Sequence, residues 1–331
     1  MLDEPDAFSA AMEQALGLYR QAGDKSGEGR VLARLARRRH GLPYAERRRM
    51  ARRGRRLCRD AGDSWAEAEV LTDLAWLVRC QIENYPRAHR MMARATDLYR
   101  AVGDEEHLVG ALRERGTWYA WFRETERAAE LLGEALALAR RRNNRREVAY
   151  LLWSLGYQAA NDDDLHRAEE LLREGVQVAR TIGDAFCYVL NFAQLALVLL
   201  GRGEDAAAEA MFRECVPRCR RICECNRDTL AELFVCYEGL AILAAQSGDV
   251  RRAARLLGLA WAMDRPGPDE MTPPPYPPFM QERYARMRAT LQNAPTDLRP
   301  DWEWGRALGP TQADRFALGE ATFRVAPDVG P

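Results

Sequence analysis

The sequence has no long apolar run. Hydrophobic residues make up 47% of the 331 residues, yet the longest nearly apolar stretch, Val189 to Leu200, has twelve residues and includes Asn191 and Gln194. A membrane-spanning helix needs about 20 apolar residues, so we expect no membrane segment. The first six residues are largely acidic and lack the apolar stretch of a secretory signal. We therefore expect a cytoplasmic protein.

Lysine is almost missing, because Lys25 is the only lysine among 49 basic residues, which are balanced by 49 acidic residues. The net charge of zero is unevenly spread. Residues 1–59 carry 15 basic and 7 acidic side chains, a net charge of +8. Residues 30–59 alone contain 13 arginines and one acid, Glu46. Such a stretch attracts phosphates, is a solvated face, or docks against an acidic neighbour.

Histidine is scarce as well, with four residues at well-separated positions, and none of them stands in a catalytic motif. The nearest approach to a phosphate loop is Gly23-Asp24-Lys25-Ser26. It lacks a glycine directly before the lysine and follows a predicted helix instead of a strand. We therefore expect no enzymatic activity, no catalytic residues and no cofactor.

What the sequence does contain is a repeat of about 40 residues. A Gly-Asp pair recurs at Gly23, Gly62, Gly103 and Gly183, with Asn143-Asn144 in the matching place. Two further landmarks keep the same period, and the last interval of each is 45 residues. One is a small residue that follows leucine, at Ala36, Ala75, Gly116, Gly156, Ala196 and Ala241. The other is an alanine in a second helical segment, at Ala88, Ala128, Ala168, Ala208 and Ala253.

Each unit predicts a helical hairpin, whose two helices we call helix A and helix B. In residues 147–183, apolar residues recur at helical spacing in both segments, Asp164 is placed to cap helix B, and Gly183 is placed to end it. One hairpin cannot bury its apolar face alone, so hairpins stack into a superhelix, expected to be right-handed. The predicted fold is all-α with about five hairpins.

The predicted organisation has four parts. An N-terminal capping helix occupies residues 1–25, and the hairpins occupy residues 26–264. Seven prolines lie between Pro266 and Pro278, so residues 265–278 are predicted to be a proline-rich linker. Residues 279–331 are predicted to hold a C-terminal capping helix, with Phe279, Met280, Tyr284, Met287 and Leu291 on one face, and a tail that folds back.

Three segments carry a family resemblance: Leu155-Gly156-Tyr157, the run from Leu165 to Leu172, and the run from Ala179 to Asp184. They resemble a bacterial tetratricopeptide repeat. Two closing segments, Arg252 to Gly258 and Trp302 to Leu308, are similar to the end of the C-terminal helical region of actinobacterial LuxR and SARP/AfsR regulators, which pair that region with an NB-ARC ATPase.

The resemblance implies a protein- or peptide-binding scaffold or sensor module in transcription control or signalling. An NB-ARC or DNA-binding regulator is one implied partner. The chain departs from the group because the ATPase module and a DNA-binding helix pair are missing, and because Pro295 and Pro300 interrupt the segment before the terminal motif. A small-ligand-sensing repeat domain is the alternative function.

In such arrays helix A lines a concave groove. By position, the resemblance assigns to this groove a set of aromatic, arginine and polar side chains, which suits an extended peptide or an amphipathic helix. These residues are Trp76, Arg79, Arg113, Thr117, Trp121, Tyr150, Trp153, Tyr157, Asn161 and Gln194. The alternative is that Trp76 and Trp153 only pack between hairpins.

Two residue clusters offer other sites. The basic patch of Arg48, Arg49, Arg52 and Arg53 could dock phosphate or nucleic acid, although the interleaved aromatic residues that stack on bases are missing. Cys215, Cys219 and Cys223 lie four residues apart on one predicted helix face, and Cys225 follows. They could bind zinc or copper(I) or sense oxidation, or they fill gaps between helices as small apolar residues. Because Pro217 lies in this segment and metal knuckles place ligands on turns, we expect no metal site.

Overall fold

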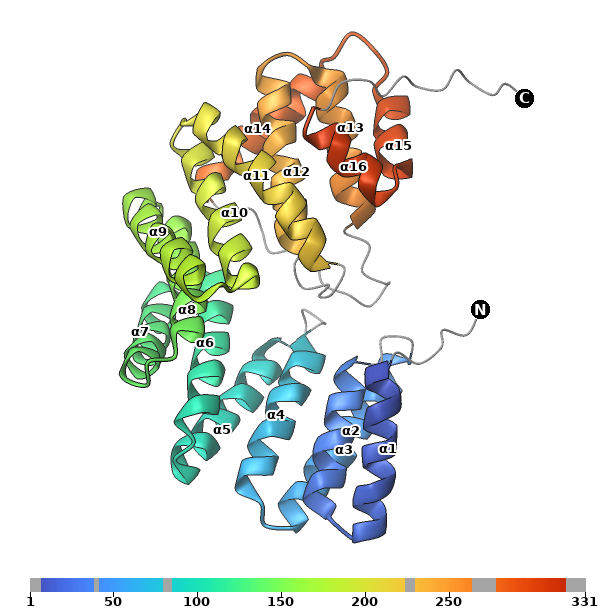
Figure 1. The fold of residues 1–331 in the computed structure, drawn as a ribbon, viewed down its shortest axis with the longest axis vertical. Coiled ribbons are helices and arrows are strands. Elements are labelled where there is room, and N and C mark those ends of the chain that lie inside the picture. Colours follow the sequence, from blue (N-terminus) through green and yellow to red (C-terminus); the bar gives the residue numbers. More distant parts are fainter. Residues whose placement is uncertain (1–6, 39–41, 80–84, 224–229, 264–277, 320–331) are drawn as a thin grey trace, which may run out of the picture. The chain divides into compact units, whose positions relative to one another are not determined.

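The protein is all-α, as predicted. In a computed structural model, residues 7–38, 42–79, 85–223, 230–263 and 278–319 are described, and they form sixteen helices and no strand (Figure 1). In chain order the helices are α1 (Ala7–Ala22), α2 (Lys25–Arg38), α3 (Tyr44–Asp60), α4 (Ser64–Arg79), α5 (Tyr85–Val102), α6 (Glu105–Trp121), α7 (Thr125–Arg141), α8 (Arg145–Asn161), α9 (Leu165–Ile182), α10 (Ala185–Gly201), α11 (Asp205–Cys223), α12 (Leu230–Gln246), α13 (Val250–Met263), α14 (Pro278–Gln292), α15 (Arg299–Ala307) and α16 (Pro310–Ala317).

The junctions between hairpins explain the forty-residue period. The glycines of the four Gly-Asp pairs at these junctions, Gly23, Gly62, Gly103 and Gly183, have a left-handed φ between 69° and 73°. The next residue then caps the following helix: Asp63 Oδ1 accepts the N–H of Ala66 at 2.9 Å, and Asp184 Oδ1 accepts that of Cys187 at 2.8 Å. Glycine therefore ends helix B of one hairpin, and aspartate begins helix A of the next.

The small-residue landmarks mark the closest approach of the two helices in a hairpin. A Cβ atom at Gly116 would lie 2.6 Å from Cγ of Leu132, and one at Gly156 would lie 2.6 Å from Cγ of Leu172. Larger side chains at these positions would push the helices apart. The alanine landmarks of helix B are all fully buried, namely Ala88, Ala128, Ala168, Ala208 and Ala253.

The chain divides into two compact units. Unit 1 comprises Met1–Tyr119, Glu130–Ala139 and Pro266–Pro274, the last of which lies outside the described residues. Within it α1 packs on α2, α2 pairs with α3, and α4 pairs with α5. Helices α2 and α4 also contact each other, so the first helices of successive hairpins are neighbours.

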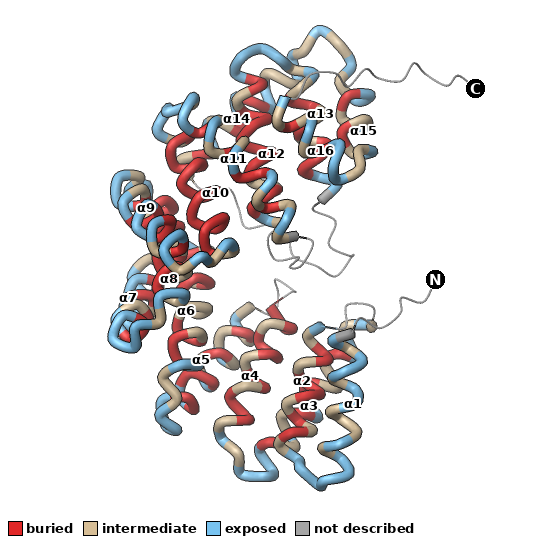
Figure 2. The backbone as a smooth tube through the Cα atoms, in the orientation of Figure 1, coloured by how far each residue is buried: buried red, intermediate tan, exposed pale blue. Residues whose placement is uncertain are grey.

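Unit 2 comprises Ala120–Ala129, Arg140–Arg265 and Pro275–Pro331. Helix α10 is its centre and contacts α8, α9, α11, α12 and α14. The long apolar stretch noted in the sequence belongs to this helix, and every residue from Cys187 to Leu200 is buried (Figure 2). That stretch is thus explained by burial within a helical stack.

The C-terminal helices α14, α15 and α16 pack on other helices of unit 2. Met280, Tyr284 and Met287 of α14 are buried, and the Tyr284 hydroxyl donates to Glu238 at 2.7 Å. Helix α15 packs on α13, and α16 packs on α11. Two glycines allow the first of these contacts, because Cβ atoms at Gly258 and Gly305 would lie 2.2 and 2.1 Å from backbone oxygens of the facing helix.

The predicted division into four parts is only partly described. The predicted N-terminal capping helix corresponds to α1, and the capping helix from residue 279 corresponds to α14. The predicted proline-rich linker lies outside the described residues except for Pro278, the first residue of α14. The bounds of these four parts stay a prediction.

Candidate functional site

Much of the positive charge of the first hairpin is neutralised inside unit 1. Arg34 Nε lies 2.9 Å from Asp73 Oδ2, and Arg37 contacts the same carboxylate at 3.1 Å. Arg55 pairs with Glu67 at 3.0 Å. The acidic neighbour of this hairpin is therefore helix α4 of the same chain, and these arginines are not a free surface.

A pocket of about 160 Å³ collects other arginines between α3, α4 and α5. No ion pair is found within the described residues for Arg52, Arg56, Arg59 or Arg87, which all line it, whereas Arg55 is the paired residue described above. Burial and then the neighbouring guanidinium groups, Arg48 first, lower the pKa of Arg87. This pocket can receive an anionic group, because no carboxylate of the described residues forms an ion pair with those four arginines.

Of the predicted basic patch of Arg48, Arg49, Arg52 and Arg53, one residue lines this pocket. Arg52 lines it, while Arg53 pairs with Glu28 at 2.9 Å. Arg48 is half-buried and Arg49 is exposed. Sequence reasoning did not include Arg87, which reaches the pocket from α5. The sequence alone does not indicate Arg87, because this residue lies outside the first hairpin and reaches the pocket only through the packing of α5.

Two of the predicted groove residues of unit 1, Trp76 and Arg79, belong to an arginine–aromatic cluster. Arg79 is only 5% exposed, and its guanidinium lies 4.2 Å from the ring centre of Trp76 and 5.4 Å from that of Trp118. Trp118, which sequence reasoning missed, is fully buried, and Thr117 beside it is 4% exposed. Arg113 is half-buried and contacts Glu114 at 2.6 Å. Arg79 is therefore buried against two tryptophan rings, an arrangement in which the cation–π attraction is strengthened.

Three of the predicted groove residues of unit 2 lie on one face of α8. Trp153 meets Tyr150 edge-on with ring centres 5.5 Å apart, and stacks on Tyr157 at 6.1 Å. Tyr150 and Trp153 remain partly exposed, whereas Tyr157 is 9% exposed. We call Tyr150, Trp153 and Tyr157 the aromatic ladder of α8.

The other predicted groove residues of unit 2 are less open. Asn161 is buried and its Nδ2 donates to the carbonyl of Ala120 at 3.5 Å, so it ties α8 to the preceding segment. Gln194 is also buried, and Trp121 is half-buried. Whether any of these residues contacts a partner stays a prediction.

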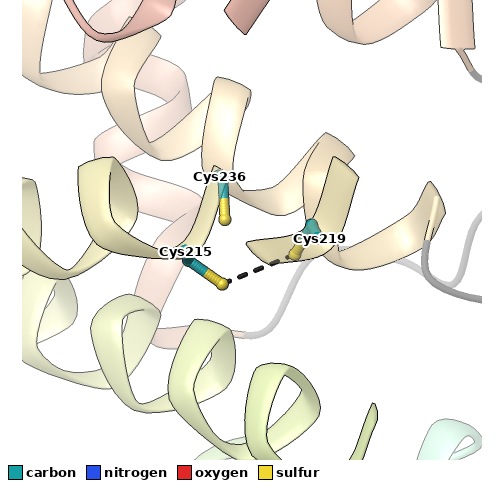
Figure 3. Close-up of side chains that lie close together, drawn as sticks. All are labelled: Cys215, Cys219 and Cys236. Atoms are coloured by element: carbon teal, nitrogen blue, oxygen red, sulfur yellow. Dashed lines mark hydrogen bonds between the residues drawn. The ribbon is translucent and has the colours of Figure 1, made fainter. Parts of the chain in front are cut away.

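Three buried thiols converge where the sequence predicted a cysteine stripe. Cys215 and Cys219 of α11 are joined by Cys236 of α12, and their sulfur atoms all lie within 4.8 Å of one another (Figure 3). Sequence reasoning missed Cys236, because α12 folds back on α11 from the next hairpin. The side chain of Cys223 and all of Cys225 lie outside the described residues.

The thiols influence one another strongly. Hydrogen bonds from Cys219, 3.5 Å away, and from Cys236 lower the pKa of Cys215 to about 5. The hydrogen bond to Cys215 raises the pKa of Cys219, and burial raises that of Cys236. Among the described His, Cys, Asp and Glu residues, this is the one group whose ligand atoms come together closely enough to hold a metal ion.

Comparison with known proteins supports the repeat assignment. Residues 192–228, which include part of α10 and all of α11, match the tetratricopeptide repeat family. No curated protein matches the chain. Among solved structures, the chain is similar to a "Circular tandem repeat protein with novel repeat topology and enhanced subunit contact surfaces", at 16% identity and a TM-score of 0.30, over 89% of this chain and 90% of that chain.

Residues 192–228 thus match a helical-repeat class that generally mediates protein–protein interaction and is typically non-catalytic. None of the described helices is long and apolar enough to cross a membrane.

Proposed function

We propose that this protein is a non-enzymatic scaffold that binds a protein or peptide partner on the helix A faces of its repeats. The aromatic ladder of α8 is the observation that carries the proposal. Tyr150 and Trp153 keep part of their rings exposed above a closely packed core. Tryptophan and tyrosine in such positions are the side chains that contribute most to protein–protein binding. The partner is an apolar peptide segment that covers these two rings.

A displayed random-peptide library selected on the immobilised protein provides the ligand for the test. Peptides from this selection should bind Trp153→Ala at least about tenfold more weakly than wild type, as expected for a binding hot spot. Trp261→Ala is the matched control, because Trp261 is 56% exposed on α13 of the same unit. Equal affinity for wild type and Trp153→Ala, at unchanged melting temperature, would rule out the ladder as the binding site.

The regulatory setting is a finer part of the proposal. It rests on the resemblance of the two closing segments, Arg252 to Gly258 and Trp302 to Leu308, to those of LuxR and SARP/AfsR regulators. In that setting the protein works in the cytoplasm and docks on an NB-ARC or DNA-binding regulator. A neighbouring gene for such a regulator would support this, and failure of the two purified proteins to associate would refute it.

The arginine pocket favours a second function, the docking of a phosphate-bearing ligand. Arg52→Ala, Arg56→Ala and Arg87→Ala combined should abolish retention on heparin, and wild-type retention should fall steeply with salt. Arg286→Ala, Arg288→Ala and Arg299→Ala remove the same charge from exposed positions on α14 and α15. If both triple variants lose retention equally, the binding reflects total charge and not the pocket.

A further inference from the structure

Three thiols meet where α11 of one hairpin packs on α12 of the next (Figure 3). Their spacing allows them to surround a single atom. Cys215 and Cys219 lie one turn apart on α11 with their sulfurs 3.5 Å apart, and Cys236 faces them from α12. Soft elements make bonds of about 2.3 Å to sulfur, which place three sulfurs around one centre about 3.5 to 4.0 Å apart. Small side-chain rotations are therefore enough to close the cluster around one atom.

A polar contact beside the thiols holds the two helices in register. Arg220 and Tyr237, which directly follow Cys219 and Cys236, both bind Asp314 of α16. The Arg220 Nε donates to Asp314 at 3.0 Å, and the Tyr237 hydroxyl donates to the same carboxylate at 2.6 Å. Packing and hydrogen bonds of this kind are what pre-organise a ligand site.

The surroundings decide which ion suits the site. Structural zinc is almost always bound by four ligands, but no fourth described His, Cys, Asp or Glu joins the group. All three cysteines are 0% exposed, so a water that served as the fourth ligand would have to be buried together with the ion. Three thiolates around a monovalent or divalent ion also leave a net negative charge in an apolar interior, which is costly.

A trivalent metalloid meets all of these conditions, because it forms three bonds to sulfur and leaves no net charge. We propose that Cys215, Cys219 and Cys236 form a binding site for trivalent arsenic, taken up as arsenous acid, between α11 and α12. This site is separate from the partner-binding surface proposed above, and neither depends on the other.

The binding reaction needs no oxidant or reductant. In each of three steps an arsenic–sulfur bond forms, an arsenic–oxygen bond breaks, and the thiol proton leaves with the hydroxide as water. Arsenic stays trivalent, and three waters are released. Cys215 and Cys219, whose sulfurs lie 3.5 Å apart on α11, can bind the arsenic first, and Cys236 then completes the site from α12. Arsenous acid is small and uncharged, so it reaches a buried site more readily than a hydrated cation.

The test uses the full chain, reduced with a thiol-free phosphine, and one equivalent of sodium arsenite. Native mass spectrometry should show one arsenic gained and three hydrogens lost. Arsenic X-ray absorption should show three sulfur neighbours and no oxygen. Cys215→Ala, Cys219→Ala and Cys236→Ala should each weaken binding by at least about a hundredfold, since loss of even an outer-sphere partner costs 10- to 100-fold.

The chain supplies matched controls. Cys58→Ala and Cys187→Ala remove buried thiols elsewhere, and the double variant Cys223→Ser, Cys225→Ser removes the thiols that follow Cys219 in sequence. All three should bind arsenic as wild type does. The proposal is overturned by absence of the adduct, by an oxygen neighbour, by unchanged binding to Cys236→Ala, or by loss of binding in the double variant. Displacement of arsenic by equimolar zinc or copper(I) would assign the site to that metal instead. If an alanine variant fails to fold, X-ray absorption of the wild-type adduct still tests the proposal, because it counts the sulfur and oxygen neighbours of arsenic.

Discussion

Asn191 is a buried polar residue that joins two hairpins of unit 2. It is fully buried in α10, and its Nδ2 donates to the carbonyls of Ala149 at 3.0 Å and Cys187 at 2.9 Å. Loss of this donor leaves buried carbonyl groups with fewer partners, which costs about 1–3 kcal/mol. We expect Asn191→Ala to lower the free energy of unfolding by that amount in urea titrations. Gln177→Ala, on the exposed face of α9, should change it by less than about 0.5 kcal/mol.

Asp104 links protein stability to pH. Burial acts to raise the pKa of Asp104, but hydrogen bonds from the N–H of His107 and the indole of Trp65, together with the nearby His107 ring, outweigh it and lower this pKa. The unfolded chain therefore binds the proton first as pH falls, and the stabilisation by the charged carboxylate is lost between about pH 3.9 and the lowered value.

Asp104→Asn is the variant that isolates this charge, because asparagine also caps helices. Wild type should be the more stable protein at neutral pH, and its advantage should shrink to nothing as the solution is acidified through that range. Urea midpoints of both proteins across the acidic range measure this. A difference that is constant with pH would show that the charge of Asp104 does not contribute.

At the scale of helices, the contact between α13 and α15 depends on two glycines. A methyl group at Gly258 or Gly305 would collide with the backbone of the facing helix, which cannot move without separating the helices. We expect Gly258→Ala and Gly305→Ala to destabilise unit 2 by about 1–3 kcal/mol in chemical denaturation.

The control for this prediction is Gly133→Ala. A Cβ atom at Gly133, in α7, would meet nothing within 4 Å. This substitution should be neutral or stabilise the protein by up to about 1 kcal/mol, because alanine favours the helix. If Gly258→Ala behaves like Gly133→Ala, the close approach of α13 and α15 does not limit stability.

The helices were predictable because their ends have strong local rules. Gly183 ends α9 and Asp184 caps the start of α10. Both the left-handed glycine and the aspartate cap depend only on the neighbouring backbone, so they can be recognised from the sequence. The pairing of residues one period apart was not recognised from the sequence. Arg34 and Asp73 are 39 residues apart, as are Trp65 and Asp104. The first pair joins opposite charges at the repeat offset, so a comparison of charges one period apart identifies it from the residues alone.

Side chains that meet through the stacking of hairpins were harder to predict. Cys236 joins Cys215 and Cys219 only because α12 packs on α11, and the last repeat interval of 45 residues breaks the period on which an alignment would rely. Arg87 reaches the arginine pocket in the same way, from the helix B of the next hairpin. The residue types were visible in the sequence, but the distances between them depend on packing.

At the scale of the whole molecule, the net charge of zero hides a basic start and an acidic remainder. A protein without net charge has little repulsion between copies, and opposite regions of two copies attract each other. We expect weak self-association in low-salt buffer near neutral pH, and its disappearance in high salt as screening increases. Light scattering over a salt series measures this. Scattering that is independent of salt would show that charge does not drive association.

The identical chemistry of the Gly-Asp junctions makes the chain divisible into interchangeable blocks. Excising residues 63–103 would join Gly62 directly to Asp104 and recreate the same helix end and cap at the seam. Gain or loss of whole blocks by genetic recombination at such seams therefore leaves every remaining helix with its own start and stop. Evolution can therefore change the number of repeats in steps of about forty residues while it keeps the same Gly-Asp turn at each new junction.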